Sequence, residues 1–540
     1  MGFDLFTDFM SAMMPKFRSK DFINILSEYM HHLNTYDVTK VSKAHIHSTY
    51  IVLHYMLLRD GFSDYKRVVE LHHKKYKQQS KKSYPFYISP IVKITKITDN
   101  SYPFIVRLNY LKLSQCLKLP INEKLALDCF KEIPNTQLDL SKPLLDNELL
   151  NALCNITHHM YACNIDWNGP DVFFECRKIL YDCTVEYLKG IKLENVQKTA
   201  IIILDNPTTG SSDYKGALEM IMALYDENYI IDVVYTCNVD VEHISPIFNN
   251  KYTTNNFSHE WLVNTFKFQY TIALFATHAF YLETILAAAN IGKHQIGMLC
   301  SLMSSGIPSI TKFFMPTWDT PNNYIETPVY LPGMACTIPV PLLYSAKQNL
   351  DYNCNVTIGV ALTGEKLNKN VGPLLKEISD RHPNITFNIL MGNVADAPIL
   401  DTALVMLHID PYISNYNIQV NDRDKYYESI NVCNFIICCD PYTSYISLCD
   451  FLAQSKPVVC LRNTLRNGSQ CASRMLELLT KNTLSIANNI TEYHAIIDRL
   501  CIDCSPDKYN IPNCQQLINI IDKHNHELRD AVKQYIKTIS

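Results

Sequence analysis

Hydroxyl and carboxylate side chains follow an apolar run in the stretch NFIICCDPYTSYISLCDFLAQ. The run Phe435–Cys439 predicts a strand buried on both faces of a parallel sheet. The residues that come after it include Thr443, Ser444, Ser447 and Asp450. Hydroxyls and free N–H groups at a helix start can bind a pyrophosphate, and a carboxylate nearby can accept both hydroxyls of a ribose. This order predicts a nucleotide-sugar site. Helix capping and an ordinary polar position are the structural alternatives.

The same pattern repeats directly afterwards. We expect the helix after the first strand to run from Thr443 or Ser444 to about Ala453, because Lys456-Pro457 interrupts it. Val458–Leu461 predicts a second buried strand, and the basic loop Arg462–Gln470 leads to a helix expected at about Cys471. Loops of this kind lie at the carboxyl ends of parallel strands, which is where open α/β sheets bind ligands.

Residues elsewhere could complete the chemistry. Lys366 follows the predicted strand Val356–Val360, where a lysine can neutralise a diphosphate leaving group; a solvated lysine is the alternative. Asp166 precedes a predicted helix and could deprotonate or orient an acceptor. The small polar loop Asn206–Ser212 could line a phosphate or sugar pocket, or form an ordinary surface turn.

A metal site is not expected. The residues Cys501, Cys504, Cys514, His524 and His526 have the donor atoms for zinc, but they include one Cys-x-x-Cys pair and match no standard spacing.

Composition limits the classes of function. The 540 residues include 49 Lys and Arg against 53 Asp and Glu, a net charge of −4, so general nucleic-acid binding is not expected. No apolar run approaches the roughly 18–20 residues that cross a bilayer. The N-terminal stretch carries Asp4 and Asp8 where a signal peptide would be basic, which predicts a cytoplasmic protein. Several of the 19 cysteines lie in predicted strands, which favours reduced thiols.

The chain divides into three predicted parts. Residues 1–195 show helical spacing, including Asn147–Met160 and Val172–Leu188, and predict an all-α domain. Alternating strands and helices then predict two open α/β domains, 196–345 and 346–540, the second ending in helices from Ser485. A proline-containing linker is expected at Pro332–Leu350, and ligand is expected between the two halves. The further predicted strands are Ala200–Leu204, Ile230–Tyr235, Thr271–Phe275, Gln295–Leu299, Thr327–Leu331 and Thr386–Met391. The further predicted helices are Lys215–Tyr225, Phe280–Ala289, Val371–Arg381 and Ala397–Leu407.

From about residue 147 to 530 the chain resembles a known family. Thr363–Asn368 is similar to its segment ending Lys-Leu-Asn, Cys433–Asp450 to its "Cys-Asp…Asp" run, and Gln454–Cys460 to its Gly-Leu-x-Gly-Val-Cys. Leu484–Leu500 resembles its "Leu-Ile-Ala-Asn…Glu-Tyr…Arg-Leu". The family is that of the cytoplasmic bacterial N-glucosyltransferases of high-molecular-weight adhesins, relatives of the O-linked N-acetylglucosamine transferases in glycosyltransferase family 41.

The resemblance implies a GT-B fold, with two Rossmann-like domains after an all-α domain. It implies transfer of a hexose, glucose first, from a UDP-sugar to asparagine of an Asn-x-Ser/Thr protein such as an adhesin, without metal or other cofactor. Lys366 would then hold the diphosphate, Asp450 the nucleotide, and Asp166 would be the catalytic base; Asn467 stands where the family's basic loop has His-Glu-His.

The chain also departs from the family. Asn206–Ser212 lacks the family's histidines, and Tyr442–Ser447 replaces its Asn-Thr-Asn-Gly donor loop. An alternative is therefore a catalytically silent homologue that binds a protein partner or serves as an accessory subunit. A phosphorylase or a small-molecule transferase on the same fold is a third alternative.

Overall fold

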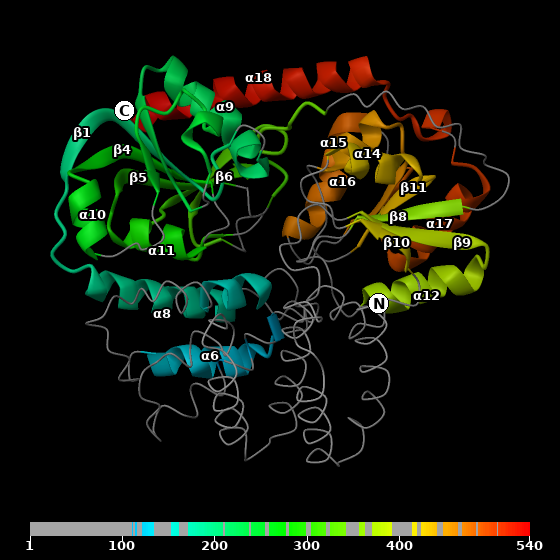
Figure 1. The fold of residues 1–540 in the computed structure, drawn as a ribbon, viewed down its shortest axis with the longest axis horizontal. Coiled ribbons are helices and arrows are strands. Elements are labelled where there is room, and N and C mark those ends of the chain that lie inside the picture. The colour runs from blue at the N-terminus through cyan, green and yellow to red at the C-terminus, as the bar shows by residue number, and fades with distance from the viewer. Residues whose placement is uncertain are drawn as a thin grey trace, which may run out of the picture.

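Two parallel sheets form the framework of the molecule (Figure 1). The structure is a computed structural model that describes residues 121–133, 153–160, 171–208, 211–236, 239–253, 259–276, 280–298, 304–319, 324–341, 356–361, 370–390, 413–417, 423–439, 447–462, 467–481, 484–504 and 506–539, with residues 108, 111, 114 and 115. The first sheet has the order β3-β2-β1-β4-β5-β6-β7 and the second β10-β9-β8-β11-β12-β13. Both orders are those of a Rossmann-like sheet, extended by one strand in the first.

The first sheet is covered on both faces. Its strands are β1 (Glu194–Leu204), β2 (Ile230–Tyr235), β3 (Lys251–Thr253), β4 (Phe268–Phe275), β5 (Gly292–Met298), β6 (Lys312–Pro316) and β7 (Thr327–Leu331). In β1, Ile201 and Ile203 belong to one buried cluster, whereas Ile202 and Leu204 belong to another. Because alternate side chains of a strand point to opposite faces, the run AIIIL is apolar throughout.

Helices from both ends of the chain cover these faces. On the first face lie α9 (Ser212–Asp226) and part of α18 (Cys514–Ile539), and on the second α10 (His259–Thr265) and α11 (Phe280–Ala288). The helices α6 (Glu123–Glu132) and α8 (Asp171–Tyr187), with the helical residues 153–160, pack beneath that second face (Figure 1). A 3-10 turn, η3 (Val241–His243), precedes β3.

The second sheet repeats the arrangement. Its strands are β8 (Val356–Ala361), β9 (Ile385–Leu390), β10 (Ile413–Asn417), β11 (Phe435–Cys438), β12 (Val458–Leu461) and β13 (Ile486–Ala487). One face packs against α12 (Val371–Arg381) and α17 (Ile490–Ile502), and the other against α14 (Arg423–Asn431), α15 (Ser447–Ala453) and α16 (Asn467–Thr480). A second 3-10 turn, η8 (Pro506–Tyr509), leads into α18.

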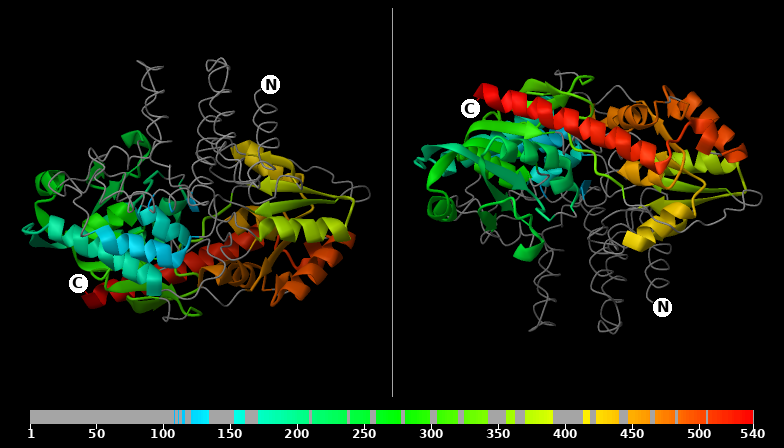
Figure 2. Two further views of the ribbon diagram at one scale, coloured as in Figure 1. Left: turned by 90° about the horizontal axis from the view of Figure 1, so that it is seen from below. Right: turned by 90° about the horizontal axis from the view of Figure 1, so that it is seen from above.

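The C-terminal helix α18 crosses from the second half to the first (Figure 2). Its 26 residues span about 39 Å. Asn525 accepts a hydrogen bond from the Ile338 N–H at 3.0 Å and donates one to the Ile338 carbonyl at 2.9 Å. Arg529 donates to Glu219 of α9 at 2.5 Å. Residues 334–338, in the segment predicted as a linker, are buried beneath this helix, so that part of the segment is a packed connection.

The structure confirms the predicted α/β architecture of GT-B type. The predicted bounds of β2, β7, β12 and α12 match those observed, and most other predicted elements differ by a few residues. Cysteines in predicted strands, among them Cys438 and Cys460, are buried thiols, as the sequence predicted. None of the described helices is both long and apolar enough to span a bilayer.

Several predictions of elements were wrong or incomplete. β1 begins at Glu194, because its polar first half pairs with β4 across a register shift between Val196 and Ala200. α16 begins at Asn467, ahead of the expected Cys471. The sequence did not predict β3, β6, β10 or β13, and β13 lies in a segment expected to be helical. The helix expected at 397–407 and those expected before residue 108 lie outside the described residues.

Candidate functional site

The residues predicted to bind the nucleotide sugar come, in the sequence, after two neighbouring strands. β8 and β11 are adjacent and parallel, and their last residues, Ala361 and Cys438, are register partners. The strand order reverses here, since the connections from β8 build the sheet outward on one side and those from β11 on the other. In the sequence, Lys366 comes five residues after the end of β8, and Thr443–Ser447 comes after β11. Reversal points of this kind are where open α/β sheets bind ligands.

Only some of the predicted site residues lie within the described part of the structure. Ser447 and Asp450 are described with their side chains, and Asn467 is described as the first residue of α16. Asp166, Lys366, Thr443 and Ser444 lie outside the described residues. α16 follows β12, the neighbour of β11, so Ser447 and Asn467 begin helices at the same edge of the sheet.

Asp450 lies in the first turn of α15, one turn nearer the helix start than the sequence predicted. Its neighbours Leu448, Cys449, Phe451 and Leu452 are buried, whereas Asp450 is half-buried. The hydroxyl of Tyr427, from α14, donates a hydrogen bond to Asp450 Oδ1 at 2.9 Å. Tyr427 is 1% exposed, so its ring is fixed by packing and holds the carboxylate from one side.

The first sheet has a matching reversal between β1 and β4. Asp205 follows β1, Thr236 follows β2, and Tyr281 is the second residue of α11, which comes after β4. Thr236 donates to the Asp205 carbonyl at 3.4 Å and lies within hydrogen-bonding reach of Tyr281. Burial, with the nearby charge of Asp205, raises the pKa of Tyr281 to about 12. None of these three residues was predicted from the sequence as a site residue, although Asp205 and Thr236 directly follow predicted strands and Tyr281 is the second residue of a predicted helix.

The loop Asn206–Ser212 is organised by its own hydrogen bonds. Thr208 N–H donates to Asn206 Oδ1 at 3.0 Å, and the Ser211 hydroxyl donates to the Asn206 carbonyl at 2.6 Å. Ser211 is also the N-cap of α9, accepting from Tyr214 N–H at 3.1 Å. These bonds are typical of a capped turn, and they favour the structural alternative for this loop.

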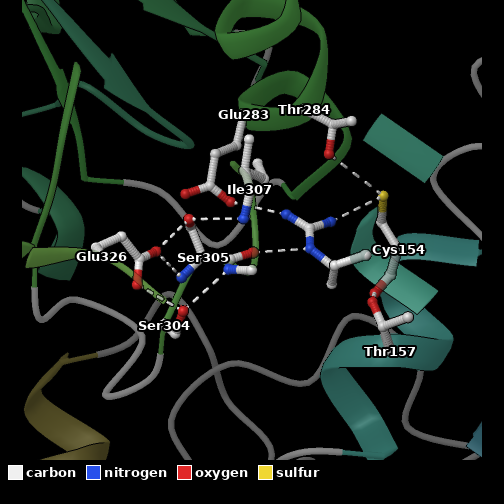
Figure 3. Close-up of polar contacts among 10 residues, drawn as sticks. Cys154, Thr157, Glu283, Thr284, Ser304, Ser305, Ile307 and Glu326 are labelled. Atoms are coloured by element: carbon white, nitrogen blue, oxygen red, sulfur yellow. Dashed lines mark hydrogen bonds and ion pairs between the residues drawn. The ribbon is translucent and has the colours of Figure 1, made fainter. Parts of the chain in front are cut away.

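A buried polar cluster joins the N-terminal helices to the first sheet (Figure 3). Arg177 of α8 contacts Glu283 of α11 at 3.1 Å, donates to the Ser305 carbonyl at 2.9 Å and lies 3.4 Å from Cys154 Sγ. The Arg177 side chain is fully buried. Beside it, Glu326 accepts hydrogen bonds from the Ser304 hydroxyl at 2.6 Å and from Ser305 N–H at 2.8 Å.

Burial governs the protonation of this cluster. It raises the pKa of Glu283 to about 8, against the opposing charge of Arg177, and it raises the pKa of Glu326 as well. Sequence reasoning missed the cluster. A signal was present, because Arg177 and Glu283 are single opposite charges on the apolar faces of two helices.

The zinc candidates have other contacts. His524 Nε2 lies 3.1 Å from the Cys336 carbonyl oxygen, and His526 Nδ1 lies 2.7 Å from that of Asp522. Burial raises the pKa values of the Cys501 and Cys504 thiols. Within the described ranges no three His, Cys, Asp or Glu side chains are grouped as metal ligands would be.

Comparison with known proteins gives similarity to solved structures alone. No protein-family model matches the chain, and no curated protein does. A mutant O-GlcNAc transferase of Thermobaculum terrenum is 12% identical, with a TM-score of 0.47 over 92% of this chain and 100% of its own. HepE of Anabaena, solved in complex with UDP and glucose, is 11% identical, with a TM-score of 0.39 over 63% of this chain and 98% of its own. The lipopolysaccharide outer core galactosyltransferase WaaB is 10% identical, with a TM-score of 0.36 over 62% and 99%.

Proposed function

We propose that the protein is a metal-independent glycosyltransferase that moves a hexose from a UDP-sugar to asparagine of a protein acceptor. Glucose is the first candidate for this hexose. The observation that supports this most is that the two segments predicted to bind the UDP-sugar follow adjacent strands of the second sheet. The Lys366 loop and the segment leading to Asp450 follow two adjacent strand ends at the reversal of the second sheet. A cytoplasmic location and an Asn-x-Ser/Thr acceptor, adhesin-like or other, belong to the same proposal.

Each residue of the site has a distinct part in this proposal. Asp450 accepts the ribose hydroxyls, while Thr443, Ser444, Ser447 and Asn467 bind the phosphates or the sugar. The bond between the anomeric carbon and the UDP oxygen breaks, and Lys366 neutralises the charge that develops on the diphosphate.

On the acceptor side, the asparagine nitrogen forms the new bond to the anomeric carbon. Its proton passes to the Asp166 carboxylate. No redox step is involved, and the products are the glycosylated protein and UDP. The reaction therefore balances with a UDP-sugar and a protein as the two substrates.

The test is release of UDP from a panel of UDP-sugars with an Asn-x-Thr peptide as acceptor. We expect turnover with one donor, and a loss of about 100-fold or more in Lys366→Ala, since a cation on a leaving phosphate is worth several kcal/mol. Lys376→Ala is the control, because Lys376 lies on the exposed face of α12 beside Asp380. If no UDP-sugar of the panel gave turnover, the proposal would be overturned for this chain acting alone.

The acceptor base is tested separately. We expect Asp166→Asn to lower turnover by about 10²–10⁴-fold with UDP affinity retained, as for loss of a general base. Asp205→Asn is the comparison, because Asp205 lies at the reversal of the first sheet. A loss confined to Asp205→Asn would move the base from Asp166 to Asp205.

A catalytically silent, partner-binding homologue is the second candidate. It is favoured by the loop Asn206–Ser212, which contains no histidine and whose Ser211 hydroxyl is used as a helix cap. This candidate predicts no UDP release with any donor. Co-purification of a transferase or its substrate with the full chain would then support it, and turnover by the chain alone would overturn it.

A further inference from the structure

The contact between Tyr427 and Asp450 connects two helices that are separate in sequence. Tyr427 lies in α14, which precedes β11, and Asp450 lies in α15, which follows it. Both helices cover the same face of the second sheet, where Tyr427 and Ile430 belong to one buried cluster with Leu448 and Leu452. The hydroxyl of Tyr427 is therefore delivered to Asp450 by a packed framework.

The chemistry of the contact is asymmetric. Tyr427 donates to Oδ1 of the carboxylate at 2.9 Å. A carboxylate has about four acceptor positions, so it can retain a bond from the protein and still accept two hydroxyls from a ligand. A neutral donor also fixes the direction of the carboxylate without cancelling its charge, as a cation would. Asp450 is half-buried, so a ligand can approach it.

We infer that Tyr427 is a positioning residue for a ribose-binding carboxylate, and that it sets how strongly the site distinguishes ribose hydroxyls. This inference rests on the proposed function, in which Asp450 accepts those hydroxyls. With the Tyr427 hydroxyl in place, Asp450 is held in one rotamer ready for a ribose. Without it, the carboxylate loses one of the bonds that orient it, which lowers affinity for that part of the ligand alone.

The experiment compares UDP with 2′,3′-dideoxyuridine diphosphate, which lacks both ribose hydroxyls. Dissociation constants are measured by titration calorimetry for the native chain, Tyr427→Phe, Asp450→Ala and the double variant. In the native chain we expect the dideoxy ligand to bind about 10- to 100-fold more weakly, as for lost hydrogen bonds to a charged group. In Tyr427→Phe this ratio should fall by about 3- to 10-fold, through weaker binding of UDP alone.

Two comparisons separate positioning from a structural role. Tyr493→Phe is the control, because Tyr493 is also buried and donates to the Cys438 carbonyl at 3.0 Å from the opposite face of the same sheet. It removes a hydroxyl without touching Asp450, so the ratio should stay native. In the Asp450→Ala background, Tyr427→Phe should have no further effect on UDP affinity, since it acts through the missing carboxylate.

Each other outcome overturns a defined statement. An unchanged ratio in Tyr427→Phe overturns this inference and leaves the proposed transferase standing. Equal binding of both ligands by the native chain overturns the ribose contact of Asp450, and the inference with it. Binding of neither ligand by the native chain overturns both this inference and the proposed function.

Discussion

Glu283 and Asp450 occupy corresponding places in the two halves of the molecule. Each lies in the first turn of the helix that follows the strand at the reversal of its sheet, α11 after β4 and α15 after β11. Their surroundings differ. Glu283 is 5% exposed and paired with Arg177, whereas Asp450 is half-buried and accepts a bond from the neutral Tyr427.

This difference separates two uses of one position. In the first half the carboxylate is used internally, because its partner Arg177 comes from α8 of the N-terminal part and joins that part to the sheet. In the second half the carboxylate is half-buried, and its donor Tyr427 is a neutral residue of the same half. A buried and paired carboxylate is expected to affect folding first, and a half-buried one with a neutral donor to affect binding first.

The largest expected effect is that of Arg177→Met. The substitution removes the donor to the Glu283 carboxyl and to the Ser305 carbonyl in a fully buried site, so we expect it to lower the free energy of unfolding by about 3–5 kcal/mol. Chemical denaturation measures this. Lys178→Met is the control, because Lys178 is exposed and its pair with Asp182 at 2.5 Å should contribute less than about 1 kcal/mol. Equal effects of the two variants would contradict the structural role of the cluster.

Gly306→Ala tests the packing of the same cluster. Gly306 has a φ of +66°, and a Cβ there would lie 2.9 Å from Cβ and Cγ of Arg177. We expect a loss of about 2–4 kcal/mol from backbone strain and overpacking together. Gly190→Ala shares the strain, with a φ of +97°, but meets nothing within 4 Å, so it should cost about 1 kcal/mol. If Gly306→Ala cost no more stability than Gly190→Ala, Arg177 would be able to move aside without loss of stability.

Glu283→Gln tests the protonation of the cluster. The folded protein raises the pKa of Glu283 to about 8 from an ordinary 4.5, so between these values the native state holds a proton that the unfolded state releases. Stability contributed by Glu283 therefore falls as pH rises from about 5 to 8, by up to about 1.4 kcal/mol per pH unit, and is constant above. Gln cannot titrate, so the stability of the native chain relative to Glu283→Gln should decline over this range. A constant difference would contradict the raised pKa.

The sequence predicted the framework well where burial alone determines it. Runs such as Phe435–Cys438 and Val458–Leu461 are apolar because both faces of the strand are covered, and that pattern is visible without coordinates. It failed for β3 (Lys251–Thr253) and β13 (Ile486–Ala487), whose few residues are held mainly by pairing with β2 and β12. Strands that depend on a neighbour carry little signal of their own.

The site was predicted less completely, for a related reason. Thr443, Ser444, Ser447 and Asp450 come after a buried parallel strand. This order predicts a ligand-binding edge of the sheet, because open α/β sheets bind ligands at the carboxyl ends of their strands. The bond from Tyr427 could not be predicted, since it joins helices on either side of β11 through tertiary packing. Arg177 was passed over because a charged residue is expected at the surface, and its burial depends on Glu283 more than 100 residues away.

The smallest expected change in stability completes the comparison. Asp450→Asn keeps an acceptor for Tyr427 and removes the charge, so the free energy of unfolding should change by less than about 1 kcal/mol. UDP affinity should nevertheless fall by about 10-fold, because a hydrogen bond to a charged acceptor is stronger than one to an amide. Denaturation and calorimetry on the same preparation measure both. A loss of stability as large as that of Arg177→Met, with UDP affinity unchanged, would show that Asp450 is used internally as Glu283 is, and the two halves would then not differ in the way inferred.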